Sequence, residues 1–259
     1  MENRKEIGLI VAACALIAAG AYFYYRMSGP AATPVLAPES GKPAAPQAPA
    51  ALPMTLEQGE ATIHEEAAGL SPDPLMGRWL KVKDLIRRIT AAADAVAGGG
   101  SPRLPLDFLA PAGKFSVKRK GGALYLDPKS YARYDRAADA FASLSASAVA
   151  GLYARLKPLF EEACKEEGCW KLGFQGTLTQ AIQQLLQAPQ VQGDIRLRKK
   201  VISYAMTDGF LEGLGAAPKH LLRMGPRNTA IIQGKLREIA LALGIPDDKL
   251  PHSAVYSAK

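Results

Sequence analysis

The residues that carry most metal and acid–base chemistry are scarce in this sequence. Its 259 residues include three histidines and three cysteines. None of the histidines (His64, His220 and His252) has a cysteine or carboxylate at a spacing that favours metal ligation. We therefore predict no metal ion, and we expect the histidines to lie at the surface or to cap helices.

Sequence motifs of common enzyme classes are missing too. There is no Gly-x-Ser-x-Gly nucleophile elbow and no glycine-rich loop that ends in Gly-Lys-Ser/Thr. Adjacent acids occur at 161–162, 166–167 and 247–248, where we expect solvated surface. We predict no cofactor and assign no catalytic residue, although a fold can still assemble an acid–base pair from distant positions.

Long tracts of like charge are also absent. The formal net charge is +8, but positive and negative residues alternate, and the most basic segments, 118–120 and 196–200, are short. Nucleic-acid binding is therefore disfavoured.

The first feature that is present is a hydrophobic run at residues 7–25, which is 19 residues without a charge. As a helix it is about 28 Å long, close to the ~30 Å hydrocarbon core of a bilayer. Arg4 and Lys5 precede it and only Arg26 follows directly. The positive-inside rule then places residues 1–27 as cytoplasmic N-terminus and anchor, with the rest of the chain in the periplasm at the inner membrane.

Two other interpretations of this run stay open. Ala19-Gly20-Ala21 resembles a signal-peptide cleavage site. The segment 11–14, "VAAC", resembles a lipoprotein box that would lipidate Cys14.

Residues 28–53 are a Pro/Ala-rich segment with seven prolines. Proline fixes φ and removes a hydrogen-bond donor, so neither helix nor sheet propagates. We predict a disordered linker that spans up to ~80 Å when extended. It is either a spacer across a periplasm or a simple tether.

Residues 54–245 are predicted to form a mostly α-helical domain, and residues 246–259 a C-terminal tail. Apolar stripes with helical spacing run through 82–96, 149–163, 178–186 and 232–243. We expect these to be core faces. Alternating apolar residues around Gly121-Gly122 predict a small β-hairpin at 114–127. The Gly/Pro-rich segment 98–113 predicts a loop, and its Leu104, Leu106, Phe108 and Leu109 suggest that it packs across a surface.

Three motifs resemble a known bacterial family. They are "DPKSYARYD" (127–135), "LYARLKPLFEEA" (152–163) and "LLRMGPRN" (221–228) followed by "KLREI" (235–239). Together they resemble the domain of unknown function 3014, over most of residues 55–243. The resemblance implies a single-pass anchor, a Pro-rich linker and this domain, and it implies no established activity. Arg227 departs from the acidic residue usual in the family, so we leave it out of the candidate residues.

Five polar or aromatic residues are weak binding candidates: Tyr131, Arg133, Tyr134, Arg223 and Asn228. An arginine flanked by tyrosines suits recognition of a carboxylate or glycan. The alternative is a hydrogen-bonded cluster between helices. Gly225-Pro226 itself predicts a joint, with Gly225 in the left-handed conformation ending one helix and Pro226 opening the next.

Cys164 and Cys169 are candidates for a local disulfide. Gly168 between them would end a helix and turn Cys169 back toward Cys164. In the periplasm such a bridge would persist; two free buried thiols are the alternative.

The sequence thus leaves three functions open. The first is a non-enzymatic, membrane-anchored periplasmic domain that binds an envelope protein or glycan. The second is an envelope-associated hydrolase with acidic catalytic residues. The third reverses the topology and makes the basic domain cytoplasmic, in contact with nucleic acid or anionic lipid. The oligomeric state is not predicted.

Overall fold

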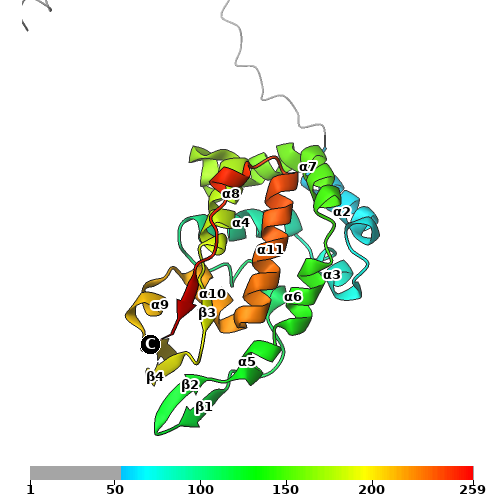
Figure 1. Cartoon of the computed structure of the whole chain (residues 1–259). Coiled ribbons are helices and arrows are strands. Elements are labelled where there is room, and N and C mark those ends of the chain that lie inside the picture. The colour runs from blue at the N-terminus through cyan, green and yellow to red at the C-terminus, as the bar shows by residue number, and fades with distance from the viewer. Residues whose placement is uncertain (1–53, 259) are drawn as a thin grey trace, which may run out of the picture. The chain divides into compact units, whose positions relative to one another are not determined.

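Helices supply most of residues 54–258, the part of the chain that the computed structural model describes (Figure 1). The mostly helical class is therefore confirmed. The α-helices are α2 (Leu56–Leu70), α3 (Pro74–Trp79), α4 (Leu85–Ala97), α5 (Pro128–Ala132), α6 (Asp135–Ala142), α7 (Ala146–Glu167), α8 (Gly173–Leu186), α9 (Gly209–Gly213), α10 (Ala216–Met224) and α11 (Pro226–Ala242). Three short 3-10 helices are η1 (Asp107–Leu109), η2 (Cys169–Lys171) and η3 (Asp247–Lys249).

The expected anchor at 7–25 and the linker at 28–53 lie outside the described residues. Within residues 54–258, none of the helices combines the length and the apolar character that crossing a bilayer requires. Residues 51–259 form a unit of their own by their internal contacts. All three clusters of buried apolar side chains in the described part lie within this unit, so we expect it to fold without residues 1–50.

The strands form two small sheets. Strands β1 (Val117–Lys120), β2 (Ala123–Leu126), β4 (Arg196–Lys199) and β5 (Tyr204–Met206) make an antiparallel sheet in that order. Its first two strands confirm the predicted hairpin. Strands β3 (Gln190–Gln192) and β6 (Val255–Ser257) pair in parallel. The segment expected to be a tail therefore contributes η3 and a strand.

The largest core cluster joins α2, α4, α7 and α8, and it includes Ile86, Leu156, Leu159 and Phe174, each almost fully buried. A second cluster lies between the four-stranded sheet, α9 and α10, and a third between α8, α11 and the C-terminal residues. Figure 1 shows α11 running along the domain from the strand end to the end where α7 and α8 lie. This helix contacts α6, α7, α8 and α10.

The joint between α10 and α11 is built by Gly225 and two buried polar residues. Gly225 has a φ of 86° and a ψ of 163°, a glycine conformation but not the left-handed helical one expected from the sequence. A Cβ at this position would lie 2.4 Å from Cγ of Tyr131, so the ring needs the bare glycine. Asn228 Nδ2 donates to the backbone oxygens of Tyr131 and Met224 at 3.1 and 2.9 Å. Thr229 Oγ1 donates to the Leu221 oxygen at 2.7 Å. The joint thereby fixes α11 to α5 and α10.

We predict that Gly225→Ala destabilises the domain by at least ~2 kcal/mol, because the new methyl group meets the Tyr131 ring and the positive φ disfavours alanine. Gly234→Ala, in the middle of α11, is the matched control. Its Cβ meets nothing within 4 Å, so helix propensity should stabilise the domain by ~0.5–1 kcal/mol. Urea denaturation of both variants measures the difference, and shifts of the same sign and size would contradict this role for Gly225.

Candidate functional site

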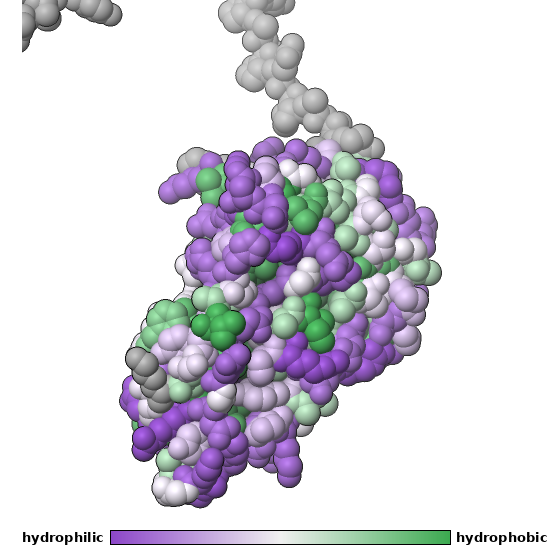
Figure 2. All heavy atoms as spheres, viewed as in Figure 1, coloured by the Kyte–Doolittle hydropathy of each residue, from purple (hydrophilic) through white to green (hydrophobic). Residues whose placement is uncertain are grey.

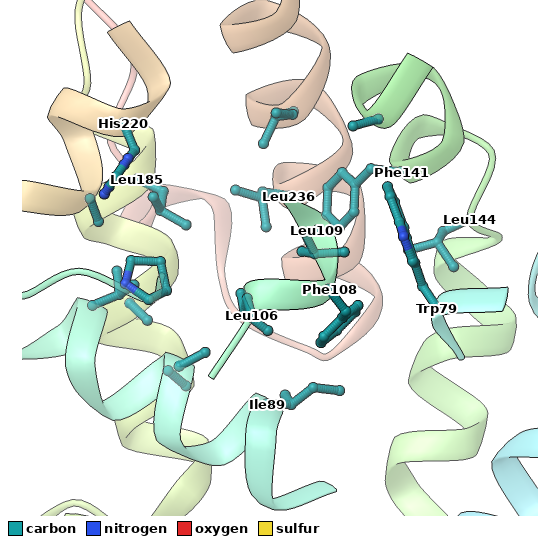
Figure 3. Close-up of a pocket in the computed structure, with 18 of the residues that line it drawn as sticks. Trp79, Ile89, Leu106, Phe108, Leu109, Phe141, Leu144, Leu185, His220 and Leu236 are labelled. Carbon is teal, nitrogen blue, oxygen red and sulfur yellow. The ribbon is translucent and has the colours of Figure 1, made fainter. Parts of the chain in front are cut away.

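A cavity of about 1560 Å³ lies between the helices of the domain. Side chains from α3, α4, α6, α8, α10 and α11 point into it, as Figure 3 shows for Trp79, Ile89, Phe141, Leu185 and Leu236. Protein interiors are normally close-packed, with few voids larger than a water molecule. Small-molecule pockets usually hold about 300–1,000 Å³, so this cavity is large even for a ligand site.

The lining is almost entirely apolar. Some of its large side chains, such as Trp79, Ile89 and Phe141, are only half-buried although they lie between helices, because the hollow leaves one side of each without a neighbour. On the face drawn in Figure 2, polar side chains predominate and apolar ones surface in small separate patches. Tyr153 adds an isolated polar group: it lines the cavity, and its buried hydroxyl has no hydrogen-bond partner in the described part of the chain.

Residues 98–113, which we call the strap, run along the cavity. Leu106, Phe108 and Leu109 of the strap line it, and η1 forms around the last two. The sequence correctly predicted that these three side chains pack. Leu104 also borders the cavity, but its surface is 87% exposed, so the prediction that it packs was wrong.

Arg88 on α4 fastens the middle of the strap. Its guanidinium donates to Asp107 Oδ1 at 2.8 Å and to the Pro105 oxygen at 3.1 Å, and it lies 5.8 Å from the centre of the Phe108 ring. At the start of the strap, the Ala216 amide donates to the Gly99 oxygen at 3.1 Å. At its end, Arg133 donates to the Gly113 oxygen at 3.1 Å. The strap is thus tied to α4, to α10 and to Arg133, the residue that follows α5.

One part of the lining is cationic. Arg103 of the strap, and His220 and Arg223 of α10, belong to it, and Figure 3 shows His220 beside the cavity. His220 Nε2 lies 2.9 Å from Ser101 Oγ. Burial lowers the pKa of His220 below its ordinary value, and the charges of Arg223 and Arg103 lower it further. His220 was expected at the surface or as a helix cap. It is instead half-buried and bonded to Ser101, and the sequence did not indicate this contact because the two residues are 119 positions apart.

The five sequence candidates separate into two groups. Arg133, Tyr134 and Arg223 line the cavity, and the Arg133 guanidinium lies 5.2 Å from the centre of the Tyr134 ring. Tyr131 and Asn228 belong to the α10–α11 joint instead. Burial raises the pKa of Tyr131 to about 12, and Asn228 is 1% exposed. This second group matches the alternative of a hydrogen-bonded cluster between helices.

Arg227, which is not among these five candidates, has a structural role. It donates to Asp139 Oδ1 at 2.8 Å and to Asn228 Oδ1 at 3.0 Å. It therefore ties α6 to the joint and does not line the cavity.

The remaining chemistry-bearing residues do not form a second site in the described part. A disulfide joins Cys164 to Cys169, with their Cα atoms 5.1 Å apart, and Gly168 between them has the left-handed conformation expected. His64 and His252 lie apart from the cavity lining, and residues 54–258 contain no group of three His, Cys, Asp or Glu arranged for a metal ion. Among the described residues, Asp107 is the one acid on the lining of the cavity, and it forms an ion pair with Arg88.

A family model described as "Protein of unknown function (DUF3014)" matches residues 85–240. The chain belongs to the DUF3014 family. The match begins at α4, so it covers the strap, α6, α8 and α10 but not α2 or α3. Searches of curated proteins and of solved structures found no match to this DUF3014 chain.

For this DUF3014 domain we predict that Arg88→Met loosens the strap. The variant loses the Asp107 pair and the hydrogen bond to Pro105, a cost of about 1–2 kcal/mol to the local closed state. Hydrogen exchange of the amides at 103–110 should then accelerate roughly tenfold. Arg87→Met is the matched control, since its ion pair with Glu166 lies outside the cavity lining. Equal exchange in the two variants would show that Arg88 does not hold the strap.

Proposed function

We propose that this domain is a non-enzymatic binding module that holds an apolar, chain-like molecule in its cavity. We further propose that residues 7–25 anchor it to the inner membrane with the domain in the periplasm. The observation that carries the first proposal is the cavity of about 1560 Å³ with its apolar lining.

An apolar occupant suits this lining for physical reasons. Side chains that face a void forgo dispersion contacts on that side. An alkyl chain placed there would restore these contacts and would itself leave water, which is worth about 25 cal/mol per Å² of apolar surface. The volume has room for more than one chain of a lipid-like molecule.

The periplasmic location rests on two observations. The charge bias around residues 7–25 favours an N-terminus in the cytoplasm. The Cys164–Cys169 disulfide fits a compartment in which disulfides persist.

A glycan or an envelope protein, the partners expected from the sequence, fits this cavity less well. A glycan presents many hydroxyl groups, and each would need a hydrogen-bond partner when buried. The lining offers few polar atoms, and those of Asp107 and Arg133 already serve the strap. An envelope protein would bind the outer surface and would leave the hollow unexplained.

The hydrolase alternative finds no support in the geometry of the acids. Glu161 accepts the Phe174 amide at 2.9 Å at the start of α8, Glu166 pairs with Arg87, and Asp247 pairs with Arg237. These acids therefore serve local structure, and none of them lines the cavity.

The proposal predicts that filling the cavity blocks binding. Leu236→Trp places an indole where Leu236 points into the hollow, whereas Leu241→Trp adds the same group at an exposed position of the same helix. Residues 51–259 would be titrated with the uncharged fluorescent probe N-phenyl-1-naphthylamine. We expect binding to the wild type and to Leu241→Trp, and at least ~tenfold weaker binding to Leu236→Trp, a loss of about 1.4 kcal/mol.

Urea denaturation controls for folding, and we expect Leu236→Trp to be no less stable than wild type, since the cavity has room for the indole. The proposal fails if the wild type does not bind the probe, or if both tryptophan variants bind it equally.

A further inference from the structure

The cationic part of the lining contains two arginines without a counter-charge. Within residues 54–258, the guanidinium groups of Arg103 and Arg223 make no ion pair and no hydrogen bond; the one such contact of Arg103 is from its backbone amide to Ser101 Oγ. Arg223 is half-buried on α10. The only acid on the cavity lining in this part of the chain, Asp107, already pairs with Arg88. The positive charge at this edge of the cavity is therefore not balanced by any residue that the structure describes.

Arg133 shows what a structural arginine on the same lining does. Its guanidinium donates to the Ser130 and Gly113 oxygens and lies over the Tyr134 ring. Each of these interactions gives it a fixed place. Arg103 and Arg223 have no such contacts, so their donors remain available to a ligand.

We propose that the cavity binds a long-chain amphiphile with one anionic head, whose carboxylate or phosphate pairs with Arg223 and Arg103 while its chain fills the apolar hollow. This inference rests on the proposed function and names the class of ligand. Arginine favours carboxylates and phosphates because its planar donors match two oxygens at once. Arg103 is exposed on the strap, whereas Arg223 is half-buried beside the apolar lining, which strengthens a pair with Arg223 by limiting its contact with water.

His220 makes the same pairing sensitive to pH. The groups that face its ring are Ser101, Arg103 and Arg223. Without a ligand, burial and the two arginines keep the pKa of His220 below its ordinary value of 6.5. An anion beside it would raise this pKa, so the complex binds more protons than the free domain. Affinity for an anionic ligand must then rise as the pH falls toward and below 6.5.

The test compares two competitors with the same chain, dodecyl sulfonate and dodecanol, as displacers of N-phenyl-1-naphthylamine from residues 51–259. The sulfonate keeps its charge at every pH used. We expect it to displace the probe at a concentration at least ~tenfold lower than dodecanol does. Arg223→Gln should reduce this preference to below ~threefold and leave dodecanol unchanged. Arg78→Gln, which removes the same charge from an exposed position of α3 outside the lining, should keep the full preference.

The outcomes separate this inference from the proposed function. If the probe binds but sulfonate and alcohol compete equally, the anionic head is refuted and the apolar cavity stands. If the probe does not bind, the proposed function itself fails. If the sulfonate competes more strongly than the alcohol, dodecanoate and dodecyl phosphate are compared next as displacers of the probe. The stronger of the two shows whether the natural head is a carboxylate, as in a fatty acid, or a phosphate, as in a phosphate lipid. Sulfonate affinity that does not rise between pH 7.5 and 5.5, or rises equally in His220→Gln, would refute the pH linkage.

The turn between β4 and β5 exposes two adjacent aliphatic side chains to solvent. Val201 and Ile202 at this turn are 96% and 97% exposed. Isolated exposed apolar residues are common, but these two are adjacent and follow a run of four basic residues in five, at 196–200. Because Leu124 pairs with Leu197 in antiparallel strands, the β1–β2 turn, which Arg119 and Lys120 flank, lies at the same end of the sheet as the β4–β5 turn.

We infer that the β4–β5 turn contacts an anionic membrane. Val201 and Ile202 insert among the lipids, and the surrounding basic side chains pair with the lipid phosphates. Arg119, Lys120, Arg198 and Lys199 make no ion pair with the described residues, so they complement an anionic surface. Nucleic acid would use the cations but not the two aliphatic side chains.

Sedimentation with vesicles tests this contact, using residues 51–259, which lack the anchor. We expect binding to phosphatidylglycerol vesicles and not to phosphatidylcholine ones. The double change Val201→Ser and Ile202→Ser should weaken binding at least ~tenfold. Leu241→Ser, at an exposed position on α11, should not. Vesicle binding that is unaffected by the double change, or tighter binding to RNA than to vesicles, would overturn the membrane contact.

Discussion

The position of α11 depends on buried polar side chains rather than on apolar packing alone. Asn228, Thr229 and Gln233 are each at most 5% exposed on this helix. Gln233 Nε2 donates to the Leu185 and Ala188 oxygens, both at 2.9 Å, and its Oε1 accepts from Gln190 and Ser253. A buried polar group is costly unless it is hydrogen-bonded, so these bonds hold one geometry firmly. They join α11 to α5, α8, α10 and the C-terminal segment.

This anchoring explains how the domain tolerates a hollow. Tight packing normally fixes the positions of helices, and a large void removes that constraint. The face of α11 that carries Asn228, Thr229 and Gln233 also presents Ile232, Leu236 and Leu243 to the cavity. Because the polar side chains on this face are tied by directional bonds, the helix keeps its place although the apolar ones lack neighbours. The strap, by contrast, is tied at a few points only, and it is the part of the lining that can yield when a ligand enters.

The sequence predicted the helices well and the cavity not at all, for one physical reason. The stripe at 232–243 has the same periodicity whether it faces other side chains or an empty space. Arg223 was selected from its motif, but nothing near it in the sequence indicated Ser101 or Arg103 as neighbours. The sequence did not indicate β4, because Leu197 is the only apolar residue among its basic ones, or the three-residue strand β5. It did not indicate β6 because the pairing of β6 with β3 joins segments 65 residues apart.

The cavity and its cationic edge pose two separate energetic problems that one ligand would solve together. An alkyl chain supplies the missing dispersion contacts, and an anionic head supplies the missing counter-charge. Neither part alone does both, since a free anion leaves the hollow empty and a neutral oil leaves Arg223 unpaired. A ligand that binds only the folded state stabilises it in proportion to the logarithm of its concentration over Kd. The hydrogen bonds of Asn228, Thr229 and Gln233 require no ligand, so they maintain the empty domain in a form ready to bind.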